Sequence, residues 1–215
     1  MDIIYEDKNI ITVVKAPGEP SQPDKTGDRD ILTELREHTG GEVFVVHRLD
    51  RPVGGVMVYA KSSSAAAYLT ESLKKPDAGK IYLAAVNGKP EKENGNLTDF
   101  IVTDKRNNVS KTVPSKTKGA KEARLYYKVL EYNAENDLSL IMVKLFTGRH
   151  HQIRVQLSAM GNPIWGDIKY NKNFQKVKTF PALWSYSLSV NIPDKGMAEF
   201  KAYPEQVPFN IFEKI

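Results

Sequence analysis

One carboxylate stands among cations in the segment His47–Gly55, which reads HRLDRPVGG. Asp50 lies between Arg48 and Arg51, and the pair Gly54–Gly55 follows. Nearby cations favour the ionised carboxylate and lower its pKa, and glycines allow an unusual backbone or the close approach of a ligand. The segment therefore suits a nucleophilic or general-base carboxylate at the end of a strand. A turn with a structural Arg–Asp ion pair is the simpler interpretation, and composition alone favours it.

A second candidate segment, Thr147–Arg154, reads TGRHHQIR. If the chain is helical from about residue 150, the outward side carries His151, Arg154, Val155 and Ser158, and the buried side carries Ile153, Leu157 and Met160. His151 and Arg154 would then project together. A metal site built from His47, His150 and His151 is not expected, because adjacent histidines on a helix diverge and no carboxylate stands at ligand spacing.

Tyr82 is the third candidate and lies in the expected strand 80–87. Alternation puts Ile81 and Leu83 on one face of this strand and Tyr82 on the other. A lone tyrosine on a strand usually serves packing. In an enzyme that acts on nucleic acid, the same side chain could stack on a base.

The positive charge of the chain is concentrated in residues 105–124. The basic residues of this segment are Lys105, Arg106, Lys111, Lys116, Lys118, Lys121 and Arg124, and its only acid is Glu122. The segment has a net charge of +6, whereas the whole chain has +5, so the remaining residues together carry −1. We expect a loop-like stretch that is either a solvated surface loop or an arm that contacts the phosphates of a polyanion.

The composition excludes several classes of protein. The 215 residues include no cysteine, which rules out disulfide scaffolds, cysteine-ligated zinc and thiol nucleophiles. The N-terminal stretch MDIIYEDKNII has no secretory pattern. No apolar run approaches the roughly 18 residues of a membrane helix. A cytoplasmic protein without a membrane partner is expected.

Strands outnumber helices in the expected element order and do not alternate with them regularly. Strands are expected over 9–15, 43–46, 56–60, 80–87, 124–132, 138–146 and 182–190. Helices are expected from Asp28 or Asp30 to Gly40–Gly41, from Ser62–Ser64 to Lys74–Pro76, and over about 150–160. This pattern favours an α+β fold with a mixed, largely antiparallel sheet flanked by helices and loops.

Two further expectations concern organisation. The stretch 182–190 alternates strictly, so it predicts a strand of an antiparallel sheet with Trp184 and Leu188 on a buried face and Ser185 and Ser187 on the opposite face. We assign residues 1–215 to one domain, with the polar segment 88–120 as the best candidate for a break or an insertion.

Taken together, three blocks resemble the RluA-type RNA pseudouridine synthases. The blocks are HRLDRPVGGVMVYAKS, KIYLAAVNG and TGRHHQIRVQLSAMGNPIWGDIKY, and the N-terminal loop VVKAPGEPSQPD also resembles the family. The order and spacing of these blocks match those of the family over about residues 3–205. The resemblance implies the pseudouridine synthase fold, an RNA substrate that is ribosomal or transfer RNA, and no cofactor or metal. A monomer is the default expectation.

The resemblance also implies a role for each matching residue. Asp50 matches the essential aspartate, which acts as the nucleophile or abstracts a sugar proton to give a glycal. Arg154 matches the arginine that pairs with this aspartate, and Tyr82 the tyrosine that stacks on the target base and is a candidate to deprotonate C5. Arg48 is placed where it could fill the space of the extruded nucleotide or bind its phosphate. The further residues expected to contact RNA are Arg51, Arg149, His151, Lys105, Arg106, Lys111, Lys116 and Lys118.

The chain departs from the family pattern at few positions. Gly54 stands where the family usually has serine, and Leu183–Trp184 stands where a Leu-His pair is usual. An S4-type RNA-binding domain is absent from the sequence, so target selection is expected from the catalytic domain and its loops. Two alternatives stay open. One is a catalytically silent RNA-binding protein. The other is a hydrolase that uses Asp50 with a histidine, although the sequence offers it no well-placed second carboxylate and no set of metal ligands.

Overall fold

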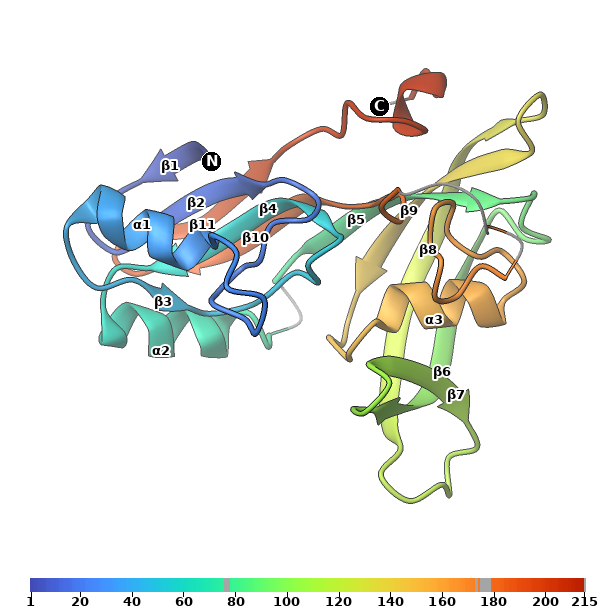
Figure 1. Cartoon of the computed structure of the whole chain (residues 1–215), viewed down its shortest axis with the longest axis horizontal. Coiled ribbons are helices and arrows are strands. Elements are labelled where there is room, and N and C mark those ends of the chain that lie inside the picture. Colours follow the sequence, from blue (N-terminus) through green and yellow to red (C-terminus); the bar gives the residue numbers. More distant parts are fainter. Residues whose placement is uncertain (76–77, 173, 175–178, 215) are drawn as a thin grey trace. The chain divides into compact units, whose positions relative to one another are not determined.

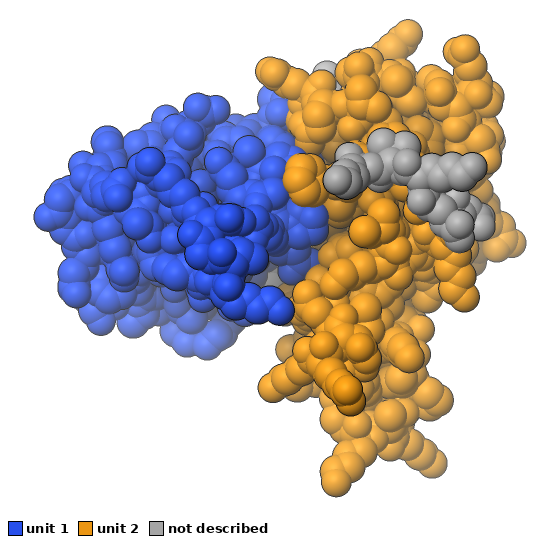
Figure 2. All heavy atoms as spheres, viewed as in Figure 1, with its two compact units in different colours: residues 1–80, 184–203 blue, residues 81–183, 204–215 orange. Residues whose placement is uncertain are grey.

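The computed structural model describes residues 1–75, 78–172, 174 and 179–214, and it divides into two compact units (Figure 2). Unit 1 comprises residues 1–80 and 184–203, and unit 2 comprises residues 81–183 and 204–215. The assignment of the whole chain to one catalytic domain stays a prediction. Each unit carries its own part of the sheet (Figure 1).

Unit 1 is built on a sheet in the order β1-β2-β4-β10, with β3 added to β4 and β11 added to β10. The strands are β1 (Asp2–Glu6), β2 (Ile10–Lys15), β3 (Phe44–Val45), β4 (Gly54–Ala60), β10 (Leu183–Ile192) and β11 (Gly196–Lys201). Strand β4 is buried along its whole length, which explains its apolar sequence on both faces.

The two helices of unit 1 begin and end where their capping residues predict. Helix α1 (Ile31–Thr39) begins after Asp30, whose side chain accepts from the Thr33 amide, and ends at Gly40 with φ of 62°. Helix α2 (Ser63–Ser72) begins after Ser62, which accepts from the Ala65 amide. It packs on the sheet through a cluster that includes Ala65, Leu69, Leu73, Val56, Val58, Leu188 and Val190. Pro76, expected near its end, lies outside the described residues.

The prediction of a strand over residues 182–190 is confirmed, but the purely antiparallel pairing and the uncovered serine face are wrong. Strand β10 pairs in parallel with β4, through Trp184 with Gly54 and Ser185 with Gly55, and antiparallel with β11. Ser185 and Ser187 are both buried. Their hydroxyls donate to Val56 O at 3.0 Å and Glu199 Oε1 at 2.6 Å, so small hydroxyls satisfied by hydrogen bonds line a covered face.

Unit 2 is built on an antiparallel sheet in the order β5-β9-β8-β6-β7. Its elements are β5 (Lys80–Asn87), β6 (Asn94–Asp104), β7 (Val109–Val113), β8 (Lys121–Asn133), β9 (Leu138–Leu145), α3 (Gln152–Ala159) and the 3₁₀ turn Phe209–Ile211. The mixed, largely antiparallel α+β class is therefore confirmed. The segment 88–120 forms β6 and β7 inside unit 2 and is not a boundary.

Helix α3 packs against β6 and β7 (Figure 1). Its Val155 meets Ile101 on β6 and Ala123 on β8, and Tyr170 packs against this cluster. Gln156 adds two hydrogen bonds to the sheet, from its Nε2 to Asp99 Oδ2 on β6 at 2.7 Å and to Ala123 O on β8 at 3.3 Å. Across the described ranges, no helix has the length and apolar character that a membrane crossing requires.

Candidate active site

Asp50 lies in a tight turn between β3 and β4 of unit 1. The Val53 amide donates to the Asp50 carbonyl at 2.9 Å, and the Asp50 side chain is half-buried. Gly55, just beyond, has φ of 117°, and a Cβ there would lie 2.6 Å from the Ser185 backbone nitrogen. The glycine is therefore required for the close approach of β4 to β10 directly after the turn.

The two departures from the family pattern lie against each other. A Cβ at Gly54 would lie 2.8 Å from Trp184 Cε3 and 2.9 Å from Pro17 Cδ. The Trp184 ring thus fills the space that a serine side chain at position 54 would need. Trp184 Nε1 donates to Ala202 O at 2.8 Å, which fixes the ring. The glycine at position 54 and the tryptophan at position 184 therefore depend on each other, because the ring occupies the space next to the glycine.

A buried ammonium group, that of Lys15, supports the Asp50 turn by a hydrogen bond to the Arg51 carbonyl. Lys15 is fully buried, and its Nζ donates to Ala16 O at 3.0 Å, Glu19 O at 2.8 Å and Arg51 O at 3.0 Å. Burial lowers the pKa of Lys15 to about 8, while the charges of Glu19 and Asp50 act to raise it. A cation therefore lies within electrostatic reach of Asp50.

Arg51 is tied to the N-terminal loop of unit 1. Its Nε donates to Gly18 O at 2.8 Å, and its guanidinium pairs with Asp24 at 3.4 Å and with Asp28. These ion pairs join Arg51 to carboxylates of another loop, and a structural pair between an arginine and Asp50 within the turn stays a prediction. The contact of Arg51 with RNA stays a prediction, as does that of Arg48, whose side chain is exposed.

His47 is held as a neutral ring. Its Nε2 accepts from the Val58 amide at 3.1 Å, which makes this nitrogen the unprotonated one. Burial, and then the charge of Lys80, lowers the pKa of His47 to about 3. At neutral pH the histidine therefore supplies no cation next to Asp50.

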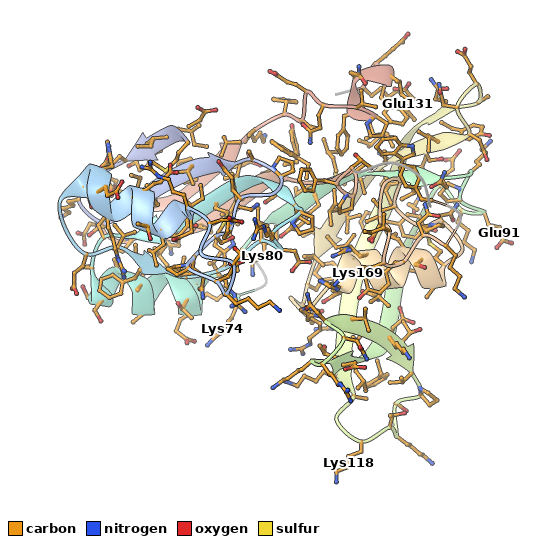
Figure 3. All side chains as sticks on the ribbon, viewed as in Figure 1. Lys74, Lys80, Glu91, Lys118, Glu131 and Lys169 are labelled. Atoms are coloured by element: carbon orange, nitrogen blue, oxygen red, sulfur yellow. The ribbon has the colours of Figure 1, made fainter. Side chains whose placement is uncertain are left out.

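Tyr82 lies near the start of β5, two residues after Lys80, which Figure 3 labels. Its register partner on β9 is Val143, which pairs in turn with Tyr127 on β8. Tyr82 is half-buried, so part of its side chain stays accessible. Its stacking on a base stays a prediction.

Arg154 sits in the first turn of α3 and is buried. Its Nε lies 2.6 Å from Asp167 Oδ2, its Nη2 lies 2.7 Å from Asp167 Oδ1, and the two side chains are 4% and 0% exposed. This two-pronged pairing fixes the guanidinium plane. Asp167 lies in the sequence GNPIWGDIKY, and no local pattern there marks it as the partner of Arg154. The pairing of Arg154 with Asp50, which belongs to unit 1, stays a prediction.

The expected outward side of the helix is wrong. All residues from Gln152 to Leu157 are buried, because the helix lies between β6, β7 and the segment around Tyr170. The helix begins at Gln152, after His151 with φ of 53°. Gln152 Oε1 accepts from the Arg149 amide at 3.0 Å and from Thr147 Oγ1 at 2.8 Å, which closes the preceding turn.

His151 is buried, and its Nδ1 lies 2.8 Å from the Tyr170 hydroxyl. Burial, followed by the charge of Arg154, lowers the pKa of His151 to about 2. A neutral buried ring cannot attract phosphate by charge. The Tyr170 hydroxyl also accepts from the Ser110 amide at 2.7 Å, so this tyrosine joins β7 to the start of α3.

The basic segment 105–124 is part strand and part loop, so the expectation of a loop-like stretch is correct for residues 105–108 and 114–120 and wrong for the strand residues. Residues 109–113 form β7 and pair with 100–104, and β8 begins at Lys121. Lys105 and Arg106 lie in the β6–β7 turn, and Lys116 and Lys118 lie in the loop after β7, whose tip carries Lys118 (Figure 3). These four side chains and that of Lys111 are exposed, as is that of Arg149, whose Nε donates to Glu122 O at 2.8 Å.

Comparison with known proteins decides the family. The family model described as RNA pseudouridylate synthase matches residues 9–159, which include the Asp50 turn, β5 and α3. The chain belongs to this family. It is 34% identical over 176 residues to the uncharacterized RNA pseudouridine synthase YhcT of Bacillus subtilis, covering 79% of this chain and 57% of the relative.

Two further likenesses agree. The ribosomal large subunit pseudouridine synthase D of Borreliella burgdorferi is 31% identical over 96% of this chain and 65% of its own length. The solved structure of human RNA pseudouridylate synthase domain containing 1 has a TM-score of 0.79 at 23% identity, covering 94% of this chain and 83% of that chain, and it supports the fold. The chain spans less than two thirds of the length of these two curated relatives.

Proposed function

We propose that the chain isomerises specific uridines of structured RNA to pseudouridine, with Asp50 as the catalytic carboxylate. The observation that carries the proposal is the family match over residues 9–159, which spans all three candidate catalytic residues. In this reaction the N1–C1′ bond breaks, the base turns, and C5 bonds to C1′. The proton lost from C5 is balanced by one gained at N1, so the mass of the RNA does not change.

Asp50 attacks or deprotonates the ribose after the target nucleotide leaves its stack. Both steps need an ionised carboxylate in a partly desolvated place, which an adjacent cation makes possible. The buried Lys15 ammonium supports this requirement from within unit 1. Arg154, fixed by Asp167, is the second cation that we assign to Asp50.

Tyr82 stacks on the extruded uracil, and its hydroxyl takes the proton from C5. Its half-buried position on β5 supports stacking, because a partly exposed ring can receive a base. Arg48, exposed beside Asp50, fills the space that the nucleotide leaves or binds its phosphate. Extrusion costs on the order of a few kcal/mol.

Contacts to the RNA backbone offset this cost. We assign them to the exposed cations of the β6–β7 hairpin and the following loop, which are Lys105, Arg106, Lys111, Lys116 and Lys118. Relatives are named for large-subunit ribosomal RNA and for transfer RNA, and we propose a substrate from these two classes. We place the reaction in the cytoplasm, where such RNA is processed, and expect a monomer.

The experiment is tritium release from RNA labelled at C5 of uridine. The wild-type chain should release tritium from ribosomal or transfer RNA that lacks the modification, whereas Asp50→Asn should fold and release none. Asp2→Asn is the matched control, because Asp2 is an exposed carboxylate of the same unit and lies on β1. Release by Asp50→Asn at the wild-type rate would refute the role of Asp50, and a change in RNA mass would indicate a hydrolase.

A further inference from the structure

The sheet of unit 2 has a second face, opposite α3. Helix α3 covers the face that carries Ile101 and Ala123. Side chains alternate along strands, so the neighbours of these residues project from the opposite side. We define the open face by the residues that the strand register places there, which are Phe100, Arg124, Tyr126, Lys128, Lys144 and Phe146.

Aromatic rings and cations are interleaved on the open face. Tyr126 on β8 pairs with Lys144 on β9, and the Phe146 amide donates to the Arg124 carbonyl at 3.1 Å. Phe146 is 48% exposed, and Lys144 Nζ lies 5.8 Å from the centre of its ring. A large exposed ring within reach of a cation can receive a base whose phosphate meets that cation.

The open face carries an excess of positive charge. Its strands bear three carboxylates on this side, Glu122, Asp104 and Glu131, and all three have local partners. Glu131 Oε2 accepts from the Glu213 and Lys214 amides at 3.0 and 3.1 Å. Glu122 pairs with Arg124 at 3.0 Å, and Asp104 accepts from the Arg106 amide at 3.0 Å. Lys128 and Lys144 remain in addition, and Lys111 of the basic segment projects from the same side.

We propose that the open face binds single-stranded RNA that flanks the target uridine, an inference that rests on the proposed RNA substrate. Bases stack on Tyr126 and Phe146, and Arg124, Lys128 and Lys144 contact the phosphates. An RNA strand fits this surface better than a second copy of the chain, because a twofold contact would bring its cations against each other. Continuity with Lys111 joins the face to the basic hairpin.

Binding of fluorescein-labelled oligo(U) RNA, measured by anisotropy at several salt concentrations, tests this proposal without requiring turnover. Phe146→Ala and Tyr126→Ala should each weaken binding about tenfold. Lys144→Ala should reduce the slope of log K against log salt by about 0.7, because one phosphate contact is lost. The same oligonucleotide paired with its complement should bind independently of Phe146, since its bases cannot stack on the ring.

Matched controls lie in unit 1. Tyr68 on α2 is 43% exposed, similar to Phe146, so Tyr68→Ala and the lysine control Lys74→Ala should bind like the wild type. Unchanged affinity of folded Phe146→Ala and Tyr126→Ala would overturn the proposal. So would a wild-type dimer that these variants dissociate without any change in RNA binding. If the wild type bound oligo(U) as expected but released no tritium from any RNA, the proposed function would fail and this inference would stand.

Discussion

Placing a serine at position 54 should destabilise unit 1, because the Trp184 ring occupies the required space. The new Cβ would lie 2.8 Å from Trp184 Cε3 and 2.9 Å from Pro17 Cδ, and both distances are below normal carbon contact. Relief requires the ring to move, which strains its 2.8 Å hydrogen bond to Ala202 O. Overpacking costs about 1–3 kcal/mol, and the lost hydrogen bond about 1 kcal/mol more.

Gly54→Ser should therefore lower the free energy of unfolding by about 2–4 kcal/mol, measured by urea denaturation. Trp184→His alone should also destabilise, because it leaves a cavity. In the double variant the smaller ring makes room for the serine, so the loss should be at least about 1 kcal/mol smaller than the sum of the two single losses. Gly41→Ser is the control, since an added Cβ there would meet only Thr39 O at 4.0 Å.

A Gly54→Ser chain as stable as the wild type would refute this packing argument. Additive losses in the double variant would also refute it, because they would show that the two positions do not share space. Gly41→Ser should stay within about 0.5 kcal/mol of the wild type.

Three further perturbations test other parts of the account. Tyr82→Phe should keep RNA affinity, because the ring still stacks, and lose turnover in the tritium assay; undiminished turnover would remove the hydroxyl from the reaction. Neutralising Lys111, Lys116 and Lys118 together should weaken RNA binding and flatten its salt dependence by about 0.7 to 0.9 per lost contact, and an unchanged slope would leave the segment without a binding role. Burial lowers the pKa of His47 from 6.5 to about 3, so below pH 6.5 the unfolded chain binds more protons than the folded chain. On acidification this group should lower the free energy of unfolding, measured by urea denaturation, by up to about 1.4 kcal/mol per pH unit. His47→Gln should lessen that fall.

The sequence predicted those elements whose signals are local. Asp30 and Gly40 bound α1, and Ser62 begins α2, because capping depends on one side chain and a few neighbouring amides. The alternation of β10 gave a wrong prediction of exposure, because a hydroxyl can be buried when an acceptor lies beside it. Ser185 donates to the Val56 carbonyl, and Ser187 donates to the Glu199 carboxylate. Alternation reports polarity, and exposure depends on what covers the face.

The candidate site was predicted only as separate segments. Asp167 escaped notice because a carboxylate thirteen residues from Arg154 has no local pattern that marks it as a partner. Lys15 looked like the end of a strand, and its support of the Asp50 turn depends on carbonyls from Glu19 and Arg51. The neutral state of His151 follows from burial beside Arg154, a tertiary property that spacing cannot reveal.

Mapping of pseudouridines across cellular RNA tests the central claim most directly. In a strain that lacks this chain, we predict the loss of pseudouridine at one or a few positions of ribosomal or transfer RNA. Supplying the wild-type chain should restore them, and supplying Asp50→Asn at equal abundance should not. An unchanged map, or full restoration by Asp50→Asn, would contradict the claim that this chain makes pseudouridine through Asp50.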